Sequence, residues 1–327
     1  MHTRTLPGTD LTLSVIGMGC WTIGGRYWGP TDDADSVAAV RAAVEHGIDW
    51  FDTAPLYGDG HADRVLARAL GSHIHRVTIA TKVGVRLDGT GPDGHDGHAH
   101  SDLRPAHILA DVEQSLRRLK EPLDLLQVHW PCEWDTPLFD TIAALEDVKA
   151  RGWIRHWGLC NYEAADLSTA RSLGPVASLQ TPYSLLRREF EGELQAACGP
   201  DLQGRPLGVL AYEALCRGLL SGKHKLPPTF GDDDMRAWDE RFHGAAFLHG
   251  NGVAQDLVAI GARMGVSAAA VALGWVASRP GVTAVIAGAR TAAQVKENVR
   301  AAALLDRPQL WQVVDKAIHR HGAPPRF

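Results

Sequence analysis

Cysteine is scarce in this chain, and its five copies are scattered rather than clustered. None of them forms a Cys-x-x-Cys pair, and an odd number cannot all be joined in intramolecular disulfides. This usage favours reduced thiols. The first residues, Met1 to Arg4, also lack the apolar core of a secretory signal. We therefore expect a cytoplasmic protein.

Long apolar runs and a surplus of positive charge are missing as well. No stretch approaches the about 18 consecutive apolar residues of a membrane-spanning helix. The formal net charge is -5, so neither nucleic acid nor an anionic membrane is indicated as a partner. The chain does contain 45% hydrophobic and 22% charged residues over 327 positions. This balance is typical of an enzyme with a sizeable core.

Strand-like and helix-like segments alternate along the chain after a predicted hairpin over residues 3–13. The short apolar runs are typical of strands that are buried on both faces, as in parallel sheets. Eight strands are predicted over residues 14–20, 48–52, 77–82, 123–128, 153–160, 176–181, 207–212 and 282–287. Helices are predicted over residues 31–46, 62–70, 105–119, 136–150, 163–172, 187–198, 252–264 and 291–303, with a closing helix over 311–318.

Eight strand–helix units without an intervening linker predict one α/β domain over residues 1–327. The expected fold is a single (β/α)8 TIM barrel with a short N-terminal hairpin and a C-terminal closing helix. Two irregular segments, residues 88–100 and 223–251, interrupt the alternation. We expect both at the carboxyl ends of the strands, where long loops are often functional.

Four titratable side chains follow the ends of three successive predicted strands: Asp52 and Tyr57, then Lys82, then His129. A phenol has a pKa of roughly 10, and a neighbouring Lys82 would depress it by charge proximity. Asp52 would keep the lysine ionised, and His129 could orient a carbonyl group. This set suits hydride attack on a carbonyl, with Tyr57 as the proton donor. The alternative is a structural ion pair, a loop aromatic and a satisfied core histidine.

A hydride donor requires a nucleotide site, and no dinucleotide fingerprint precedes a helix in the expected way. The match at residues 89–94 runs into histidines instead of a helix. Gly288 and Arg290 stand before the last predicted helix, where a helix N-terminus and a guanidinium suit a phosphate. Arg290 could alternatively only solvate the helix end.

These residues resemble the signatures of the aldo-keto reductase family, and the resemblance covers nearly the whole chain. Residues 51–58, Thr81-Lys82 and residues 127–130 look like three family motifs in the correct order. The resemblance implies that Asp52, Tyr57, Lys82 and His129 form the catalytic tetrad, with Tyr57 as the proton donor. Residues 20–25 and 28–29 look most like bacterial members that accept a broad range of carbonyl substrates.

The same resemblance implies the cofactor contacts and favours NADPH over NADH. It places Asn161 and Gln180 at the nicotinamide carboxamide, stacks Tyr212 on the nicotinamide, and assigns Arg290 to the adenine end. The first strand and Asp52 would line the cofactor pocket, and the loop after Tyr212 would wrap the pyrophosphate. The full implied set is Gly19, Cys20, Trp21, Asp52, Asn161, Gln180, Tyr212, Leu215, Gly218, Leu220, Gly222, Lys223, Gly288, Arg290, Gln294, Glu297 and Asn298.

Three positions depart from the family pattern. Cys160 replaces a serine whose hydroxyl could bond the carboxamide, and Glu213 places a carboxylate near the cofactor path. Ala287 stands where a proline is common. The fold expectation does not depend on any of them.

The expected substrate is a small-molecule carbonyl compound that contacts an aromatic wall. Its predicted contacts are Trp21, Trp28, Tyr57, His129 and Trp130. No metal site is predicted, because the histidines of residues 88–100 come without a cysteine or carboxylate ligand set.

Three other functions stay open at this point. They are an NAD(P)+-dependent sugar or alcohol dehydrogenase of the same family, a non-catalytic NADPH-sensing module, and a metal-dependent barrel hydrolase that uses His129, Asp52 and the histidine-rich loop. The sequence indicates neither the physiological substrate nor the oligomeric state.

Overall fold

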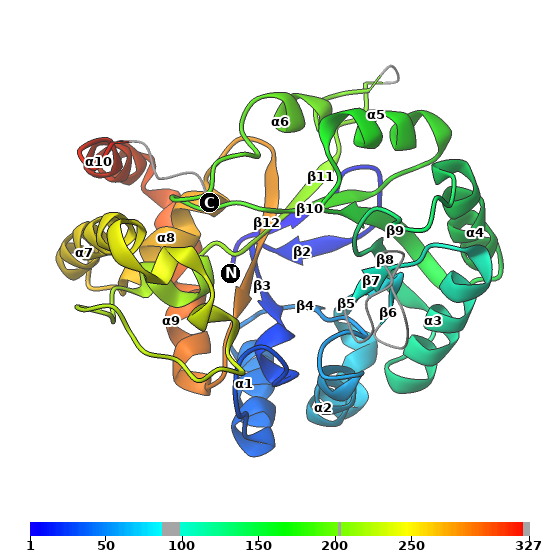
Figure 1. The fold of residues 1–327 in the computed structure, drawn as a ribbon, viewed down its shortest axis with the longest axis horizontal. Helices are drawn as coiled ribbons and strands as arrows, with labels where there is room; N and C mark the ends of the chain where they lie inside the picture. The colour runs from blue at the N-terminus through cyan, green and yellow to red at the C-terminus, as the bar shows by residue number, and fades with distance from the viewer. Residues whose placement is uncertain (87–98, 202–203, 323–327) are drawn as a thin grey trace.

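The computed structural model describes residues 1–86, 99–201 and 204–322. Its centre is a closed barrel of eight parallel strands in chain order, with the last strand paired to the first (Figure 1). This confirms the predicted (β/α)8 barrel, and each of the eight predicted strands forms one strand of it. The barrel strands are β3 (Ile16–Gly19), β4 (Trp50–Asp52), β5 (Thr78–Val83), β8 (Leu123–Val128), β9 (Ile154–Cys160), β10 (Ser178–Pro182), β11 (Gly208–Tyr212) and β12 (Val282–Gly288).

Helices surround the barrel, as Figure 1 shows. Capping signals in the sequence mark some of their ends: the Asp32 side chain accepts the backbone N–H groups of Ala34 and Asp35 at the start of α1. The α-helices are α1 (Asp33–Glu45), α2 (His61–Leu70), α3 (Pro105–Arg118), α4 (Leu138–Ala150), α5 (Ala164–Leu173), α6 (Glu193–Ala197), α7 (Gly244–Met264), α8 (Ala268–Ala277), α9 (Ala292–Ala303) and α10 (Pro308–His319). Short 3-10 turns cover Trp21–Ile23, Gly71–Arg76, Cys216–Ser221, Met235–Ala237, Glu240–Phe242 and Leu304–Asp306.

No single helix in the described part of the chain has both the length and the hydropathy to cross a membrane. Helices α7 and α8 reach these limits only when they are taken together, and they meet at a bend of 96°.

The N-terminal hairpin closes the amino end of the barrel. It consists of β1 (Thr3–Thr5) and β2 (Thr12–Ser14), which pair antiparallel as predicted. Its side chains Leu6, Leu11 and Leu13 are buried and pack in one cluster with interior barrel residues such as Trp50 and Leu210. The opposite end, where the strands finish, therefore remains for a functional site. A second small hairpin, β6 (Val85–Arg86) with β7 (His100–Ser101), was not predicted.

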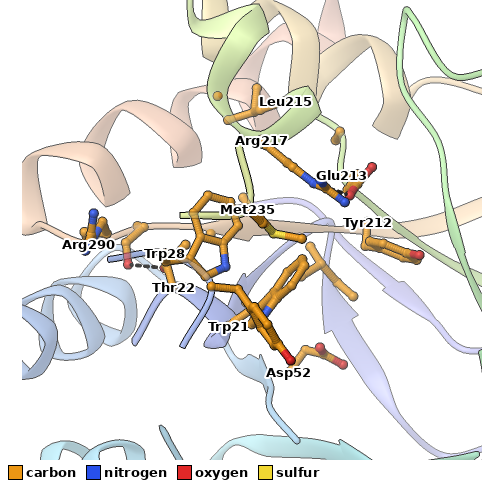
Figure 2. A pocket seen from close by; sticks show the side chains of 18 of the residues that line it. Trp21, Thr22, Trp28, Asp52, Tyr212, Glu213, Leu215, Arg217, Met235 and Arg290 are labelled. Carbon is orange, nitrogen blue, oxygen red and sulfur yellow. Dashed lines mark hydrogen bonds and ion pairs between the residues drawn. The ribbon is translucent and has the colours of Figure 1, made fainter. Parts of the chain in front are cut away.

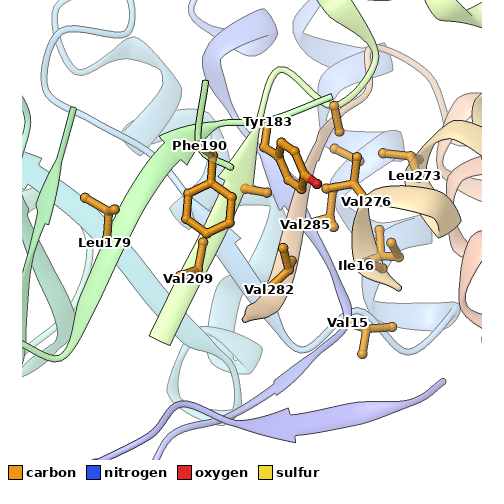
Figure 3. Close-up of a cluster of buried hydrophobic side chains, with 14 of the residues drawn as sticks. Val15, Ile16, Leu179, Tyr183, Phe190, Val209, Leu273, Val276, Val282 and Val285 are labelled. Carbon is orange, nitrogen blue, oxygen red and sulfur yellow. The ribbon is translucent and has the colours of Figure 1, made fainter. Parts of the chain in front are cut away.

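Three helices differ from the prediction. Helix α8 was missed because every residue except Ala269 is buried, so the segment lacks the polar face that produces a helical period. Figure 3 shows Leu273 and Val276 of this helix in the same cluster as Val282 and Val285 of β12.

The helix predicted over residues 187–198 is wrong in its first half, because only Glu193–Ala197 is helical. The Ser184 hydroxyl accepts the backbone N–H groups of Leu186 and Arg187 at 3.2 and 3.0 Å, which forms a turn instead. Helix α7 is also longer than predicted and begins at Gly244.

Candidate active site

A cavity of about 1070 Å³ opens at the carboxyl ends of the barrel strands. Figure 2 shows Arg290 at one end of it and Tyr212 and Asp52 at the other, with Trp28 and Met235 between them. The segment 223–251 contributes part of the wall, as expected for an insertion on this face. Residues 87–98, which include most of the other predicted insertion, lie outside the described residues.

The four predicted catalytic residues meet at the inner end of the cavity. The Lys82 ammonium donates to Asp52 Oδ1 at 2.7 Å, to the Thr53 carbonyl at 3.0 Å and to the Tyr57 hydroxyl at 3.5 Å. The His129 ring lies edge-on to the Tyr57 ring, with 6.1 Å between their centroids. Lys82 is 1% exposed and does not itself line the cavity, so it acts on the cavity through Tyr57.

Burial dominates the ionisation of this group. Burial raises the pKa of Tyr57 above its ordinary value, and the charge of Lys82 offsets this only in part. The expected net depression of the Tyr57 pKa is therefore wrong, although Lys82 does act in the expected direction. Burial alone would lower the pKa of Lys82, but Asp52 and then Tyr57 reverse this and raise it. Burial, followed by the charge of Lys82, holds the pKa of His129 well below its ordinary value.

At neutral pH the site thus holds a charged ammonium, a protonated phenol and an uncharged imidazole. A phenol that keeps its proton beside a fixed cation is a proton donor for an oxygen that gains negative charge.

A layer of amide and hydroxyl groups supports Asp52 from below. Gln180 Nε2 donates to Asp52 Oδ2 at 2.8 Å, and Gln127 Nε2 approaches the same oxygen at 3.4 Å. The Ser178 hydroxyl donates to Gln127 Oε1 at 3.2 Å. Gln127 and Ser178 were missed, although a glutamine inside the otherwise apolar end of β8 is a signal that could have found Gln127. Gln180 is predicted to hold the nicotinamide carboxamide, and one hydrogen of its side-chain amide is already donated to Asp52.

Asn161 and Tyr212 form a second linked pair at the same end. Asn161 Nδ2 donates to the His129 carbonyl at 2.9 Å, and the Tyr212 hydroxyl donates to Asn161 Oδ1 at 2.8 Å. Asn161 has a φ of 63°, a left-handed conformation that asparagine tolerates better than most residues. Tyr212 thus holds the Asn161 side chain, which in turn holds the backbone carbonyl of His129.

Aromatic rings form the wall next to Tyr57. Trp21 lies parallel to Tyr57 at 6.1 Å and edge-on to Trp28 at 5.3 Å between centroids. Trp130 lies parallel to His129 at 4.2 Å. All five predicted substrate residues line the cavity.

Positive charge gathers at the outer end of the cavity. Lys223 has no hydrogen bond or ion pair with any residue that the structure describes. Partial burial and the charges of Arg236 and Arg290 lower the pKa of Lys223. Arg290 stands just before α9, and its guanidinium donates to the Pro30 carbonyl. Arg236 was missed by the sequence interpretation, because its position in a long loop carries no periodic or motif signal. An unpartnered ammonium whose pKa is lowered by two nearby guanidinium groups suits a polyanionic ligand such as a dinucleotide with an additional phosphate.

Two segments that are distant in sequence meet at the wall of the cavity. Trp28 and Asp234 form an antiparallel bridge, and the Met235 N–H donates to the Tyr27 carbonyl at 2.9 Å. The Arg236 guanidinium holds Asp234 Oδ1 at 2.9 Å and lies 5.3 Å from the centroid of the Trp28 ring. We refer to this contact as the Trp28–Asp234 bridge.

Glu213 lies in a cage of three arginines beside Tyr212. Its carboxylate oxygens accept from Arg187 at 3.0 Å and from Arg217 and Arg241 at 2.9 Å. Asp239 binds two of these arginines in turn. Burial alone would raise the pKa of Glu213, but Arg217 and Arg241 overcome it and hold the pKa at about 2. The carboxylate near the cofactor path is therefore neutralised by its own surroundings.

All but three of the predicted cofactor residues line the cavity. The exceptions are Cys20, Leu220 and Gly222. Cys20 and Leu220 are fully buried. Gly222 has a φ of 71°, and a Cβ there would lie 2.3 Å from a Val258 methyl group, so this position shapes the loop rather than the cavity surface.

The described residues contain no group of three or more His, Cys, Asp or Glu side chains placed to hold a metal ion. Of the histidines in the predicted histidine-rich loop, the described residues include His100 only.

Comparison with known proteins gives consistent matches along the chain. The model of the Aldo/keto reductase family matches residues 15–318. The aldo-keto reductase YhdN of Bacillus subtilis is 33% identical over 300 residues, which cover 90% of this chain and 87% of the relative. The NADH-specific methylglyoxal reductase of Escherichia coli is 29% identical over 302 residues, covering 90% of this chain and 91% of the relative.

Solved structures agree with these matches. The structure of a glycerol dehydrogenase from Gluconobacter oxydans is 33% identical, with a TM-score of 0.86 over 99% of this chain and 97% of that one. An aldo/keto reductase from Klebsiella pneumoniae, in complex with NADP and acetate, is 26% identical, with a TM-score of 0.72 over 100% of this chain and 98% of that one.

Proposed function

The chain belongs to the aldo/keto reductase family, and on that basis we propose that it reduces aldehydes or ketones to alcohols with NADPH, using Tyr57 as the proton donor. Family membership establishes an oxidoreductase. The cofactor, the direction of the reaction and the residue roles belong to the proposal.

One observation carries it: a fully buried lysine lies 2.7 Å from Asp52 and 3.5 Å from the hydroxyl of Tyr57, which lines a large cavity. A structural ion pair would need only Asp52 and Lys82. The third partner, a phenol that lines the cavity, is what a proton transfer requires.

Each residue of the tetrad has a defined task in this mechanism. The neutral His129 imidazole donates a hydrogen bond that orients the carbonyl oxygen. As negative charge develops on that oxygen, Tyr57 gives it the hydroxyl proton. The Lys82 ammonium stabilises the phenolate that is left, and Asp52 keeps Lys82 ionised and in place. Bound NADPH would supply the hydride to the carbonyl carbon.

Three cations support NADPH as the cofactor. Lys223, Arg236 and Arg290 all line the cavity, with Arg290 at the end away from Tyr212 and Asp52, and a 2′-phosphate beside Arg290 would receive charge-assisted hydrogen bonds. Tyr212, Asn161 and the loop after Tyr212 would hold the nicotinamide end and the pyrophosphate. The relatives differ in their cofactor: one is NADH-specific, and the structure of another was solved with NADP.

The reverse reaction is the second candidate function. The Gluconobacter oxydans structure, at 33% identity, is that of a glycerol dehydrogenase. Oxidation of an alcohol needs Tyr57 as a base, and the raised pKa of Tyr57 makes the phenolate rare at neutral pH. The protonated phenol is the form that carbonyl reduction requires of Tyr57.

The test is a panel of aldehydes and ketones, followed at the absorbance of NADPH, for wild type and Tyr57→Phe. We expect the substitution to lower the turnover of every accepted carbonyl by about 100-fold or more, while NADPH affinity, measured by fluorescence, stays within about twofold. Wild-type turnover in Tyr57→Phe would remove Tyr57 from the role. Tight NADPH binding without turnover by the wild-type chain on the whole panel would instead support the sensing module.

The proposed location is the cytoplasm. All five cysteines are free thiols, as a reducing compartment would keep them.

A further inference from the structure

The His129 side chain has an unusual environment for a residue that must present one nitrogen to a substrate. It is 7% exposed, yet neither ring nitrogen forms a hydrogen bond with any residue that the structure describes. A functional imidazole usually has one nitrogen bonded to a carbonyl or carboxylate, which fixes the orientation of the ring. Since no described side chain or backbone group bonds the ring nitrogens, the protein restrains this ring through packing contacts.

The backbone of His129 is well anchored on two sides. Its N–H donates to the Val83 carbonyl at 3.1 Å, and its carbonyl accepts from Asn161 Nδ2 at 2.9 Å. These bonds place the Cα atom but leave rotation about the side-chain bonds free.

The Trp130 indole covers one face of the imidazole. The two ring planes are within 1° of parallel, and their centroids are 4.2 Å apart. The Trp130 backbone is itself held, because its carbonyl accepts from the Ser101 hydroxyl at 3.0 Å. The Tyr57 ring meets His129 edge-on at an angle of 80°, which confines the ring from a second direction.

We propose that Trp130 is a positioning residue for His129, and that stacking on the indole replaces the missing hydrogen bond in orienting the imidazole toward the carbonyl oxygen. The proposal rests on the proposed reductase function for its catalytic consequence. It adds a role that a wall of the substrate pocket would not have.

The same contact excludes water from the imidazole. Among the described residues, the titratable groups next to His129 are the Lys82 ammonium and the Tyr57 phenol, and neither stabilises a protonated imidazole. Loss of the indole opens one face of His129 to solvent and removes part of the burial that now lowers its pKa. Trp130 itself is 37% exposed, so its replacement leaves the core of the barrel intact.

The kinetic experiment compares Trp130→Ala and Trp130→Phe with the wild-type chain. Trp130→Ala should lower kcat at saturating carbonyl by about tenfold, because a misoriented hydrogen-bond donor loses part of its effect, with NADPH affinity within about twofold. Trp130→Phe keeps a flat ring and should recover most of kcat. Phe139→Ala removes a 65% exposed aromatic from α4 and should match the wild-type chain.

A second measurement does not depend on activity. The 15N NMR signals of His129, assigned by their loss in His129→Gln, should show no titration between about pH 5.5 and 8 in wild type and Trp130→Phe, since the ordinary histidine pKa is near 6.5. Trp130→Ala should bring the titration of His129 into this range.

Two results would overturn the proposal. One is a Trp130→Ala chain with wild-type kcat and only a raised KM, which would make Trp130 a substrate contact alone. The other is an unchanged His129 titration in Trp130→Ala. A wild-type chain that reduces no carbonyl would contradict the proposed reductase function, and the NMR result would still decide whether Trp130 holds His129.

Discussion

Replacing Glu213 by glutamine removes one negative charge from the arginine cage while keeping the shape of the side chain. Arg187, Arg217 and Arg241 all donate to this carboxylate, and the side chain is 6% exposed. After the substitution Asp239 is the only carboxylate of the cage, and it contacts Arg217 and Arg241 but not Arg187. Cations then lie close together without a full set of partners, which is destabilising in a buried site.

The size of the effect follows from the pKa of Glu213, which the cage lowers from 4.5 to about 2. A pKa difference of about 2.5 corresponds to about 3 kcal/mol of folding free energy. Because the folded pKa is depressed, this stability is fully present above pH 4.5 and is lost as the pH falls toward 2. The difference between wild type and Glu213→Gln should therefore be about 3 kcal/mol at pH 7 and roughly half of that near pH 3.

Urea unfolding at pH 7 measures the free energy directly, and a thermal melt should show a fall in Tm of roughly 4–5 °C for a chain of this length. The matched control is Asp147→Asn, which breaks an exposed pair with Arg151 at 2.7 Å and should cost less than about 0.5 kcal/mol. The loop after Glu213 lines the cavity, and Cys216 and Arg217 in it have positive φ angles. Glu213→Gln should consequently also weaken NADPH binding.

An equal loss of stability in Glu213→Gln and Asp147→Asn would refute the reasoning. So would a loss in Glu213→Gln that does not shrink between pH 4.5 and 3, because the effect would then not come from the ionised carboxylate.

Two further predictions concern the proposed chemistry. The rate of carbonyl reduction at saturating substrate should be flat between about pH 6 and 9, because Tyr57 and Lys82 have raised pKa values and His129 a lowered one, so none of them titrates in that window. A pH profile with an inflection near 6.5 would show that His129 is ionising after all. Arg290→Ala should weaken NADPH by about 10- to 100-fold and NADH far less, since the lost bonds are charge-assisted and go to the 2′-phosphate. Fluorescence titration with both dinucleotides measures this, and equal weakening of the two would take Arg290 away from the 2′-phosphate.

The positions of the barrel strands and of the tetrad were accessible from sequence because both depend on local patterns. Asp52 and Lys82 each stand at or near the end of a short apolar run, and neighbouring parallel strands bring such ends together. The 2.7 Å contact between them is the three-dimensional consequence of that placement.

Properties that depend on a balance between groups distant in sequence, such as pKa shifts, could not be predicted from the sequence. The sign of the Tyr57 pKa shift depends on how completely the barrel buries the phenol, which no motif reports. The neutralisation of Glu213 depends on Arg241, which reaches it from another loop. Helix α8 was hidden for a related reason, because a segment buried all round has no periodic contrast between polar and apolar positions.

The Trp28–Asp234 bridge has a consequence for turnover. A dinucleotide that spans the distance from Tyr212 to Arg290 would pass Trp28, Met235 and Arg236, which line the cavity at this bridge. Contacts with these residues would hold such a molecule in place, whereas a small carbonyl compound would need only the space beside Tyr57. The dwell time of the dinucleotide would then be governed by contacts that take no part in the chemistry.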